Sequence, residues 1–343
     1  MGKTEILPLL LAAALSFLFS FLLTPPAKTL AGGLGAIDLP DGEKSGRRIH
    51  KKPTPRLGGL AIFLSFFFST ALFADGPREL AALWLGGLLT VMMGVLDDVF
   101  GLKPWAKLCF QTAAALTAVL SGIRIGAVKA FGSMIHPGVY SAPLTVLWIV
   151  TLTNALNLID GLDGLACGIA SVSALSLSAV SMIGGDLSRI LPAFCLAFAC
   201  LGFLPYNRTP ASVFMGDTGA QFLGFALGVL SVPALFGEKN AVPLIVPLLI
   251  FALPVFETFF SFFRRMKSGM NPFRADRGHL HHRLLDRGFA PGEVTAILTG
   301  LSALFGAAAV LYLFFPVRAL LTASSGAVIL ILYLAVYDRK RRR

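Results

Sequence analysis

Long apolar segments divided by short polar ones are the feature that most constrains how this chain folds. A membrane helix needs about 20 predominantly apolar residues. Of the 343 residues, 56% are hydrophobic and 14% are charged, whereas soluble domains carry roughly 25% charged residues. We therefore predict an all-α polytopic membrane protein, organised as one domain over residues 1–343, with about eleven transmembrane helices. The candidate spans lie near 5–23, 57–74, 80–96, 105–121, 142–157, 165–183, 190–206, 217–235, 241–262, 291–313 and 317–337.

The basic residues indicate which side of the membrane each polar segment faces. Eleven spans place the termini on opposite sides, and cytoplasmic loops carry an excess of Lys and Arg. The side with the N-terminus carries seven of the 29 lysines and arginines, whereas the other ends in the basic run 339–343. We therefore predict a cytoplasmic C-terminus, an N-terminus outside, and cytoplasmic segments 24–56, 97–104, 158–164, 207–216 and 263–290. The net charge of +11 reflects this bias and contact with anionic lipid rather than nucleic-acid binding.

One polar segment between two apolar spans carries the strongest functional signal. Its polar side chains are two amides and two carboxylates, Asn154, Asn157, Asp160 and Asp163. Ionisable groups at membrane depth are costly and by default mark a functional site. The spacing of the aspartates predicts that they share one face of a helical turn, and Gly161 and Gly164 predict a helix break with close backbone approach. A polar loop that caps two helices is the structural alternative.

Two adjacent acids, Asp97 and Asp98, end the third candidate span. A structural interpretation is that they cap the next segment or pair with Lys103 and Lys107. Adjacent carboxylates beside a cationic loop also suit a divalent metal or a base. Oxygen ligands favour Mg²⁺, which binds through one or two carboxylates plus substrate phosphates.

A cationic loop precedes the second span. It places five lysines and arginines and a histidine within residues 47–56, and it ends in Gly58-Gly59. One interpretation is a positive-inside loop. The other is a segment that faces phosphate or pyrophosphate, which Lys and Arg suit. In that case the glycine pair would let the backbone approach a neighbouring group closely.

A further polar stretch leads into the eighth span. Asn207 and Phe214 precede Asp217, which lies between two glycines at a predicted helix start. Asp217 could be a helix N-cap, since Asp is favoured there. An aromatic ring beside an amide, on the same face as the other acids, instead suits a nucleobase.

The last polar loop gathers His279, His281 and His282 within four residues, followed by Arg283. A zinc site is the rival interpretation, but the stretch has no cysteine and no second pair of ligands at metal spacing. A cluster that faces phosphates fits the other loops better. The Gly-rich segment 122–141 is predicted to form a short hairpin on the opposite side, without chemistry.

Taken together and in order, these five stretches resemble the polyprenyl-phosphate N-acetylhexosamine-1-phosphate transferases, bacterial membrane enzymes that open lipid-linked glycan synthesis. The resemblance covers nearly the whole chain. The pattern His279-Leu280-His281-His282-Arg283 resembles the branch that uses UDP-GlcNAc. The phospho-MurNAc-pentapeptide transferases, which usually have three adjacent histidines, are the runner-up.

The resemblance implies that undecaprenyl phosphate attacks the β-phosphate of UDP-GlcNAc, giving undecaprenyl-diphospho-GlcNAc and UMP. This would be the first membrane step of cell-envelope glycan synthesis, at the bacterial cytoplasmic membrane. Direct attack is favoured, and a phospho-enzyme stays open. The expected cofactor is Mg²⁺, with Mn²⁺ as a substitute, and the expected partners are the two substrates, membrane lipid and a second copy in a homodimer. Other classes are a transporter with a site near the bilayer midplane, and a structural scaffold.

The resemblance also implies a role for each matching residue. The expected catalytic residues are Asp97, Asp98, Asp160, Asp217 and His279. The expected metal ligands are Asp217, Asp98, Asp160 and Asn157. The expected nucleotide contacts are Lys52, Asp163, Asn207 and Phe214. The expected sugar and phosphate contacts are His281, His282, Arg283, Arg274, Arg277 and Asn154.

Overall fold

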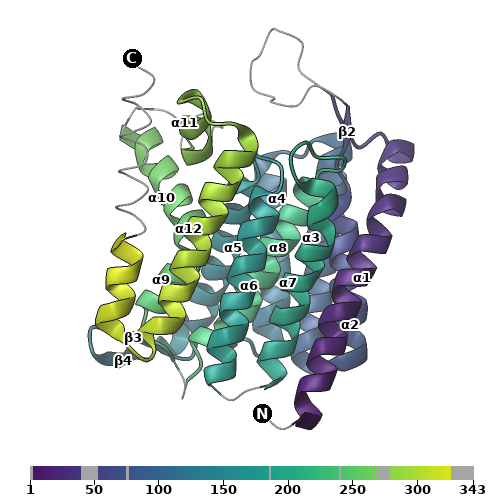
Figure 1. The fold of residues 1–343 in the computed structure, drawn as a ribbon. Helices are drawn as coiled ribbons and strands as arrows, with labels where there is room; N and C mark the ends of the chain where they lie inside the picture. Colours follow the sequence, from purple (N-terminus) through teal and green to yellow (C-terminus); the bar gives the residue numbers. More distant parts are fainter. Residues whose placement is uncertain are drawn as a thin grey trace.

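A computed structural model describes residues 3–39, 53–74, 77–184, 187–238, 241–267, 269 and 279–325. In these ranges the chain forms a bundle of long helices (Figure 1). The helices are α1 (Lys3–Leu34), α2 (Gly58–Phe73), α3 (Pro77–Phe100), α4 (Pro104–Leu120), α5 (Ser141–Ile159), α6 (Leu165–Ile183), α7 (Leu187–Asn207), α8 (Gly216–Leu235), α9 (Ile245–Ile250), α10 (Ala252–Lys267), α11 (Leu280–Asp286) and α12 (Pro291–Tyr312), with a 3₁₀ turn at Gly138–Tyr140. Seven stretches of the described residues are helical, long and apolar enough to cross a membrane, and α2 is a shorter apolar helix. The predicted all-helical polytopic class is therefore confirmed.

The ninth candidate span, 241–262, is not a single helix but two consecutive ones. The structure divides it into α9 and α10 at Phe251. Pro254 lacks an N–H and cannot donate to the carbonyl of Ile250. The hydroxyl of Ser173 donates to that carbonyl instead, at 3.2 Å. The eleventh candidate is helical over 316–325, and its remainder lies outside the described residues.

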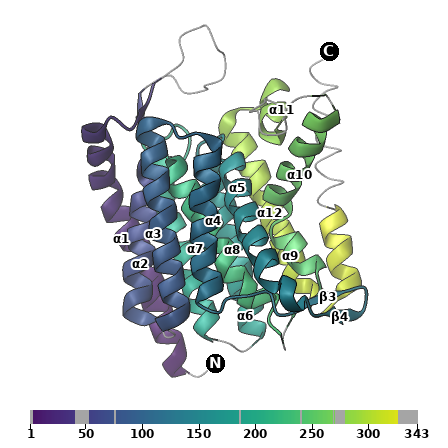
Figure 2. The same cartoon turned by 180° about the vertical axis from the view of Figure 1, so that it is seen from behind.

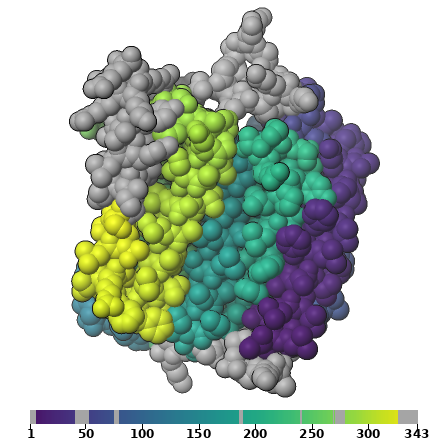
Figure 3. Space-filling model, in the orientation of Figure 1, coloured from purple at the N-terminus to yellow at the C-terminus, as the bar shows by residue number. Residues whose placement is uncertain are grey.

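The two ends of the bundle carry different structures (Figures 1 and 2). One end holds α11 and a short antiparallel pair, β1 (Ile37–Asp38) with β2 (Thr54–Pro55). The opposite end holds the hairpin of β3 (Val128–Ala130) and β4 (Ser133–Ile135), which confirms the hairpin predicted in segment 122–141. In the space-filling view, α12, α6, α7 and α1 follow one another across one face (Figure 3).

Helix α8 is the buried centre of the bundle, and glycines let its neighbours approach its N-terminal turn. A Cβ at Gly59 of α2 would lie 2.1 Å from the backbone N of Gly219. A Cβ at Gly94 of α3 would lie 2.3 Å from Cα of Thr218. The glycine pair of the cationic loop therefore permits close packing inside the protein: Gly59 faces α8, and Gly58 faces the ring of Phe203 on α7 and the carbonyl of Phe214. This packing sets the position of Asp217 at the start of α8.

Candidate active site

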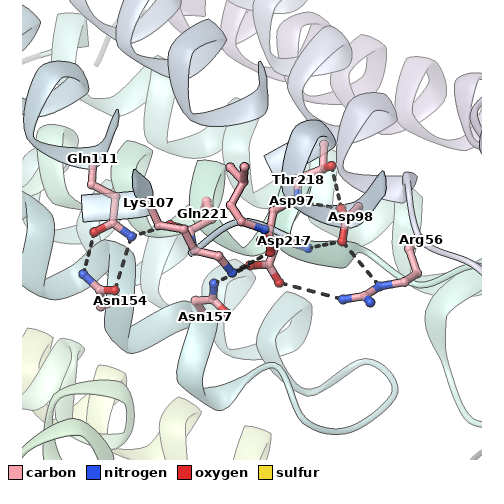
Figure 4. A network of polar contacts seen from close by, with 11 residues as sticks. Arg56, Asp97, Asp98, Lys107, Gln111, Asn154, Asn157, Asp217, Thr218 and Gln221 are labelled. Atoms are coloured by element: carbon pink, nitrogen blue, oxygen red, sulfur yellow. Dashed lines mark hydrogen bonds and ion pairs between the residues drawn. The ribbon is translucent and has the colours of Figure 1, made fainter. Parts of the chain in front are cut away.

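Charged and amide side chains from separate helix ends converge at the end of the bundle that carries β1–β2 (Figure 4). Asp97 and Asp98 come from the last turn of α3, and Lys107 comes from the first turn of α4. Asn157 comes from the last turn of α5, and Asp217 from the first turn of α8. Segments that are far apart in sequence thus form one polar cluster where helices begin or end.

Asp217 is the acceptor at the centre of this cluster. Its Oδ2 accepts hydrogen bonds from Lys107 Nζ at 2.7 Å and from Asn157 Nδ2 at 3.1 Å. Its Oδ1 lies 3.9 Å from Nη2 of Arg56, a residue just after β2. Two cations and an amide therefore surround one carboxylate.

Lys107 joins two acids that would otherwise repel each other. Besides Asp217, it forms an ion pair with Oδ2 of Asp97. The other Asp97 oxygen accepts the backbone N–H of Leu102 at 2.7 Å. Of the pairings offered by the structural interpretation of Asp97-Asp98, the one between Asp97 and Lys107 is present as part of the cluster, whereas Lys103 forms no ion pair with the described residues.

Asp98 holds the start of α8. Its Oδ1 accepts the backbone N–H of Asp217 at 3.0 Å, and its Oδ2 accepts the N–H of Thr218 at 3.0 Å and its hydroxyl at 2.7 Å. Arg56 Nε lies 3.3 Å from Oδ1. The side chain that caps α8 is thus Asp98, and the interpretation of Asp217 as the N-cap was wrong. A metal bound by Asp98 would have to displace one of these contacts.

Arg56 and Lys107 are site residues to which our sequence reasoning assigned no functional role; Lys107 was named only as a structural partner of the adjacent acids. Burial opposes the charge of the Arg56 guanidinium, but the nearby carboxylates, Asp98 foremost, outweigh burial and raise its pKa. Arg56 is one of five lysines and arginines in its loop, and the sequence did not indicate which of them would reach the acids. A lysine within the first turn of an otherwise apolar helix was the available signal for Lys107.

The Asp160–Gly164 segment is a turn, and the prediction that Asp160 and Asp163 share a helical face was wrong. Helix α5 ends at Ile159, and Gly164 has a φ of +74°, so the predicted break is confirmed. Asp163 Oδ2 accepts the N–H of Ala211 at 3.0 Å. The Asp160 carboxylate accepts no hydrogen bond from the described part of the chain. Burial and the charge of Asp217 raise the pKa of Asp160 to about 8.

Of the expected nucleotide contacts, Asn207 is the last residue of α7 and Phe214 lies in the loop that follows it. Asn207 is 4% exposed, and its amide accepts the N–H of Gly164 and donates to the carbonyl of Val213, both at 3.0 Å. The backbone of Phe214 bridges the carbonyl of Pro55 and the N–H of Gly58, at 2.7 and 3.0 Å. These contacts join the loop to the Asp163 turn and to β2.

The histidine segment is fixed from α10. Glu257, which is 3% exposed, lies 3.1 Å from His279 Nδ1 through Oε2 and accepts the N–H of Leu280 through Oε1 at 3.0 Å. His281 packs on the Asp160–Gly164 turn, because a Cβ at Gly161 would lie 2.3 Å from its Nε2. The close approach predicted for Gly161 is therefore confirmed, and its partner is His281.

Lowering the pH should destabilise the packing of α11. Burial, with His282 and His279 nearby, lowers the pKa of His281 from its usual 6.5 to about 3. The unfolded chain therefore binds this proton first, and the contribution of His281 is fully present above pH 6.5. It is lost as the pH falls from 6.5 towards 3, by up to about 1.4 kcal/mol per pH unit. The measurement is the difference in thermal unfolding midpoint between pH 7.5 and pH 5.5, in detergent. If His281→Gln lost as much stability between these pH values as the wild type, groups other than His281 would be responsible.

The remaining expected contacts divide into three groups. Asn154 lies deeper in the bundle, in an amide network with Gln111. Arg283 lies on α11 and is exposed, and His282 is partly buried there. Lys52, Arg274 and Arg277 lie outside the described residues.

A divalent cation fits the chemistry of two of these acids. Among the residues that the structure describes, no three or more His, Cys, Asp or Glu side chains are arranged to hold a metal ion by themselves. The zinc interpretation of the histidines is therefore unsupported. Mg²⁺ instead takes one or two carboxylates and completes its shell with phosphates and water. Asp217, and Asp160, whose carboxylate accepts no hydrogen bond from the described residues, match that requirement.

Comparison with known proteins gives consistent results. The model of the family described as "Glycosyl transferase family 4" matches residues 80–234. A Bacillus subtilis protein described as "Probable undecaprenyl-phosphate N-acetylglucosaminyl 1-phosphate transferase" is 34% identical over 82% of this chain and 78% of its own length. A decaprenyl-phosphate N-acetylglucosaminephosphotransferase of Mycobacterium tuberculosis is 32% identical over 91% of this chain and 84% of its own. An undecaprenyl-phosphate alpha-N-acetylglucosaminyl 1-phosphate transferase of Thermotoga maritima is 33% identical over 84% and 86%.

Proposed function

The chain belongs to the polyprenyl-phosphate N-acetylglucosamine-1-phosphate transferases of glycosyl transferase family 4, and from this premise we propose that it transfers GlcNAc-1-phosphate from UDP-GlcNAc to undecaprenyl phosphate. The observation that carries the proposal is the cluster around Asp217, in which carboxylates and cations meet at one end of a membrane-type helix bundle. A phosphoryl transfer needs charge neutralisation and in-line positioning more than covalent chemistry. The cluster supplies groups of the required kinds.

The proposed reaction is a direct displacement. A phosphate oxygen of undecaprenyl phosphate bonds to the β-phosphorus of UDP-GlcNAc, and the bond from that phosphorus to the bridging oxygen breaks. UMP leaves with that oxygen. The acceptor's second pKa is near ~6, the value for a phosphomonoester, so its attacking oxygen is already unprotonated and no strong base is needed. Asp97 accordingly holds Lys107 in place rather than removing a proton.

Each cluster residue has a part in this account. Lys107 and Arg56 face the phosphates and stabilise the negative charge that is shared during transfer. Asp98 fixes Asp217 through the start of α8. Asp217 and Asp160, with the amide oxygen of Asn157, would hold Mg²⁺, or Mn²⁺ in its place, and the ion when bound supplies neutralisation of the diphosphate. We place the diphosphate and the metal at this cluster. The segments assigned to the rest of the substrate are the turn at Asp163, the stretch from Asn207 to Phe214, and the histidine segment.

The placement in the membrane is part of the proposal. The chain crosses the bacterial cytoplasmic membrane in eleven spans, with the N-terminus outside and the cluster at the cytoplasmic side. The support is that described cations gather at the end of the bundle that carries the cluster, with Arg56 after β2 and Arg264, Arg265 and Lys267 in the last turn of α10 (Figure 1). An acceptor with a long isoprenoid tail also requires a site at the boundary between membrane and water.

Two other functions are less well supported. A transporter site is expected near the bilayer midplane, whereas Asp97, Lys107, Asn157 and Asp217 lie in first or last turns of their helices. A phospho-MurNAc-pentapeptide transferase usually has three adjacent histidines, and here Leu280 separates the first from the others. The relatives named above transfer N-acetylglucosamine phosphate.

Detergent-purified protein with undecaprenyl phosphate and Mg²⁺ tests the proposal. UDP-GlcNAc, UDP-GalNAc and UDP-MurNAc-pentapeptide are each assayed for UMP release. We expect release with UDP-GlcNAc that requires the lipid, stops in EDTA and returns when Mg²⁺ is added in excess. Preference for UDP-MurNAc-pentapeptide would favour the runner-up. Release without lipid would indicate hydrolysis, and full activity in EDTA would contradict the role of the metal.

A further inference from the structure

Three amides, two of them buried and one partly buried, lie beside the charged cluster (Figure 4). Gln111 of α4 and Gln221 of α8 are 2% and 1% exposed. Gln111 Nε2 donates to Gln221 Oε1 at 2.7 Å and to Asn154 Oδ1 at 3.2 Å. Asn154 of α5 donates back to Gln111 Oε1 at 2.8 Å and to the carbonyl of Val150 at 2.9 Å. We call Gln111, Asn154 and Gln221 the amide network.

The amide network repeats the charged cluster one helical turn deeper. Gln111 follows Lys107 by four residues on α4, and Gln221 follows Asp217 by four on α8. Asn154 precedes Asn157 by three on α5. Residues three or four apart lie on the same helix face, one turn apart. The three helices that supply Lys107, Asn157 and Asp217 are therefore joined to one another immediately below those residues.

We propose that the amide network fixes the axial register of α4, α5 and α8, and thereby sets the separations among Lys107, Asn157 and Asp217 on which binding of the metal and the diphosphate depends. Its members are positioning residues. Asn154 thus acts below the site, in place of the sugar or phosphate contact that the family resemblance implies. The inference rests on the proposed function and deepens it.

The geometry favours register control over simple attachment of helices. A buried amide that loses its partner is costly, so sliding one helix against another breaks several hydrogen bonds of the network together. Lys107 bridges two carboxylates from two other helices. A small axial shift of α4 would therefore weaken one bridge while crowding the other. Misplacement by about 1 Å can cost ~10²-fold in rate.

The test compares Gln111→Leu and Gln221→Leu with the double variant Gln111→Met/Gln221→Met. Removing both partners with residues of similar shape can leave stability nearly unchanged, so the double variant remains informative if a single variant folds poorly. The matched control is Ser231→Ala, which removes the hydrogen bond from Trp148 to Ser231, also between α5 and α8. Ser231 lies roughly 21 Å along α8 from Asp217, at 1.5 Å per residue.

Turnover per folded molecule, the half-saturating Mg²⁺ concentration and the unfolding midpoint are measured for each variant. We expect turnover to fall by about tenfold or more and the Mg²⁺ requirement to rise by about tenfold in both single variants. The double variant should regain most of the unfolding midpoint lost in the single variants, because Asn154 keeps its hydrogen bond to the carbonyl of Val150, but it should not regain the other two values. Ser231→Ala should retain wild-type turnover and Mg²⁺ requirement, whatever its midpoint.

The inference would be overturned if the single variants, or the double variant, showed the same turnover and the same Mg²⁺ requirement as the wild type. A second readout keeps this result separate from failure of the proposed function. Thermal stabilisation by Mg²⁺ with UDP needs no turnover, and it should weaken in the variants but not in Ser231→Ala. If the wild type releases no UMP, the proposed function fails. If, in addition, Mg²⁺ with UDP stabilises the wild type and the variants equally, the inference about the amide network is overturned as well.

Discussion

Asp217→Asn should abolish transfer while the protein still folds and enters the membrane. Asparagine keeps the volume of the side chain but removes the charge that holds Lys107 and faces Arg56. It also removes one of the two carboxylates assigned to the metal. Removing one group that stabilises developing charge typically costs roughly 10²–10³-fold in turnover, and we expect at least that loss. The measurement is UMP release at saturating UDP-GlcNAc, undecaprenyl phosphate and Mg²⁺.

The matched control is Glu293→Gln. Glu293 is an acid near the same end of the bundle, and its carboxylate accepts the N–H of Ala290 at the start of α12. It takes no part in the Asp217 cluster. Glu293→Gln should release UMP near the wild-type rate, whereas near-normal release by Asp217→Asn would remove Asp217 from the mechanism.

Lys107→Met should produce the second largest loss, by roughly 10²-fold in turnover. Methionine fills a similar volume but leaves Asp97 and Asp217 without the cation between them. The carboxylates then repel each other, and the phosphates lose a neutralising group. UMP release as a function of UDP-GlcNAc concentration separates the two effects, since the loss should appear mainly in kcat rather than in KM.

Lys103→Met is the matched control for Lys107→Met. Lys103 is exposed, one turn before Lys107, and forms no ion pair with the described residues. It should behave like the wild type, because its charge lies outside the cluster. Equal losses in the two variants would show that the general basicity of this turn matters, and not the bridge between Asp97 and Asp217.

Much of the fold was readable from the sequence because the membrane leaves few alternatives for an apolar chain. Apolar length predicted the helices, and glycines predicted the break after Ile159 and the hairpin at the far end. Hydropathy could not predict the division between α9 and α10. That division depends on a carbonyl that Pro254 leaves free and that Ser173, from another helix, satisfies.

The site was predictable as a set of residues but not as a set of contacts. Asp97, Asp98 and Asp217 were singled out because acids at the ends of apolar spans are costly. Which acid caps a helix, and which acid remains available to bind a metal ion, depends on tertiary geometry. Asp98 uses both oxygens on the start of α8, and only the fold brings Arg56 and Lys107 to Asp217.

The central claim is that this one polar cluster holds the diphosphate of a sugar nucleotide through a divalent cation. Isothermal titration of the purified protein with UDP-GlcNAc, in Mg²⁺ and in EDTA, tests it most directly. We predict binding in Mg²⁺ that is lost in EDTA, and that is lost in Asp217→Asn even with Mg²⁺ present. Equal affinity in EDTA, or unchanged affinity in Asp217→Asn, would contradict the account.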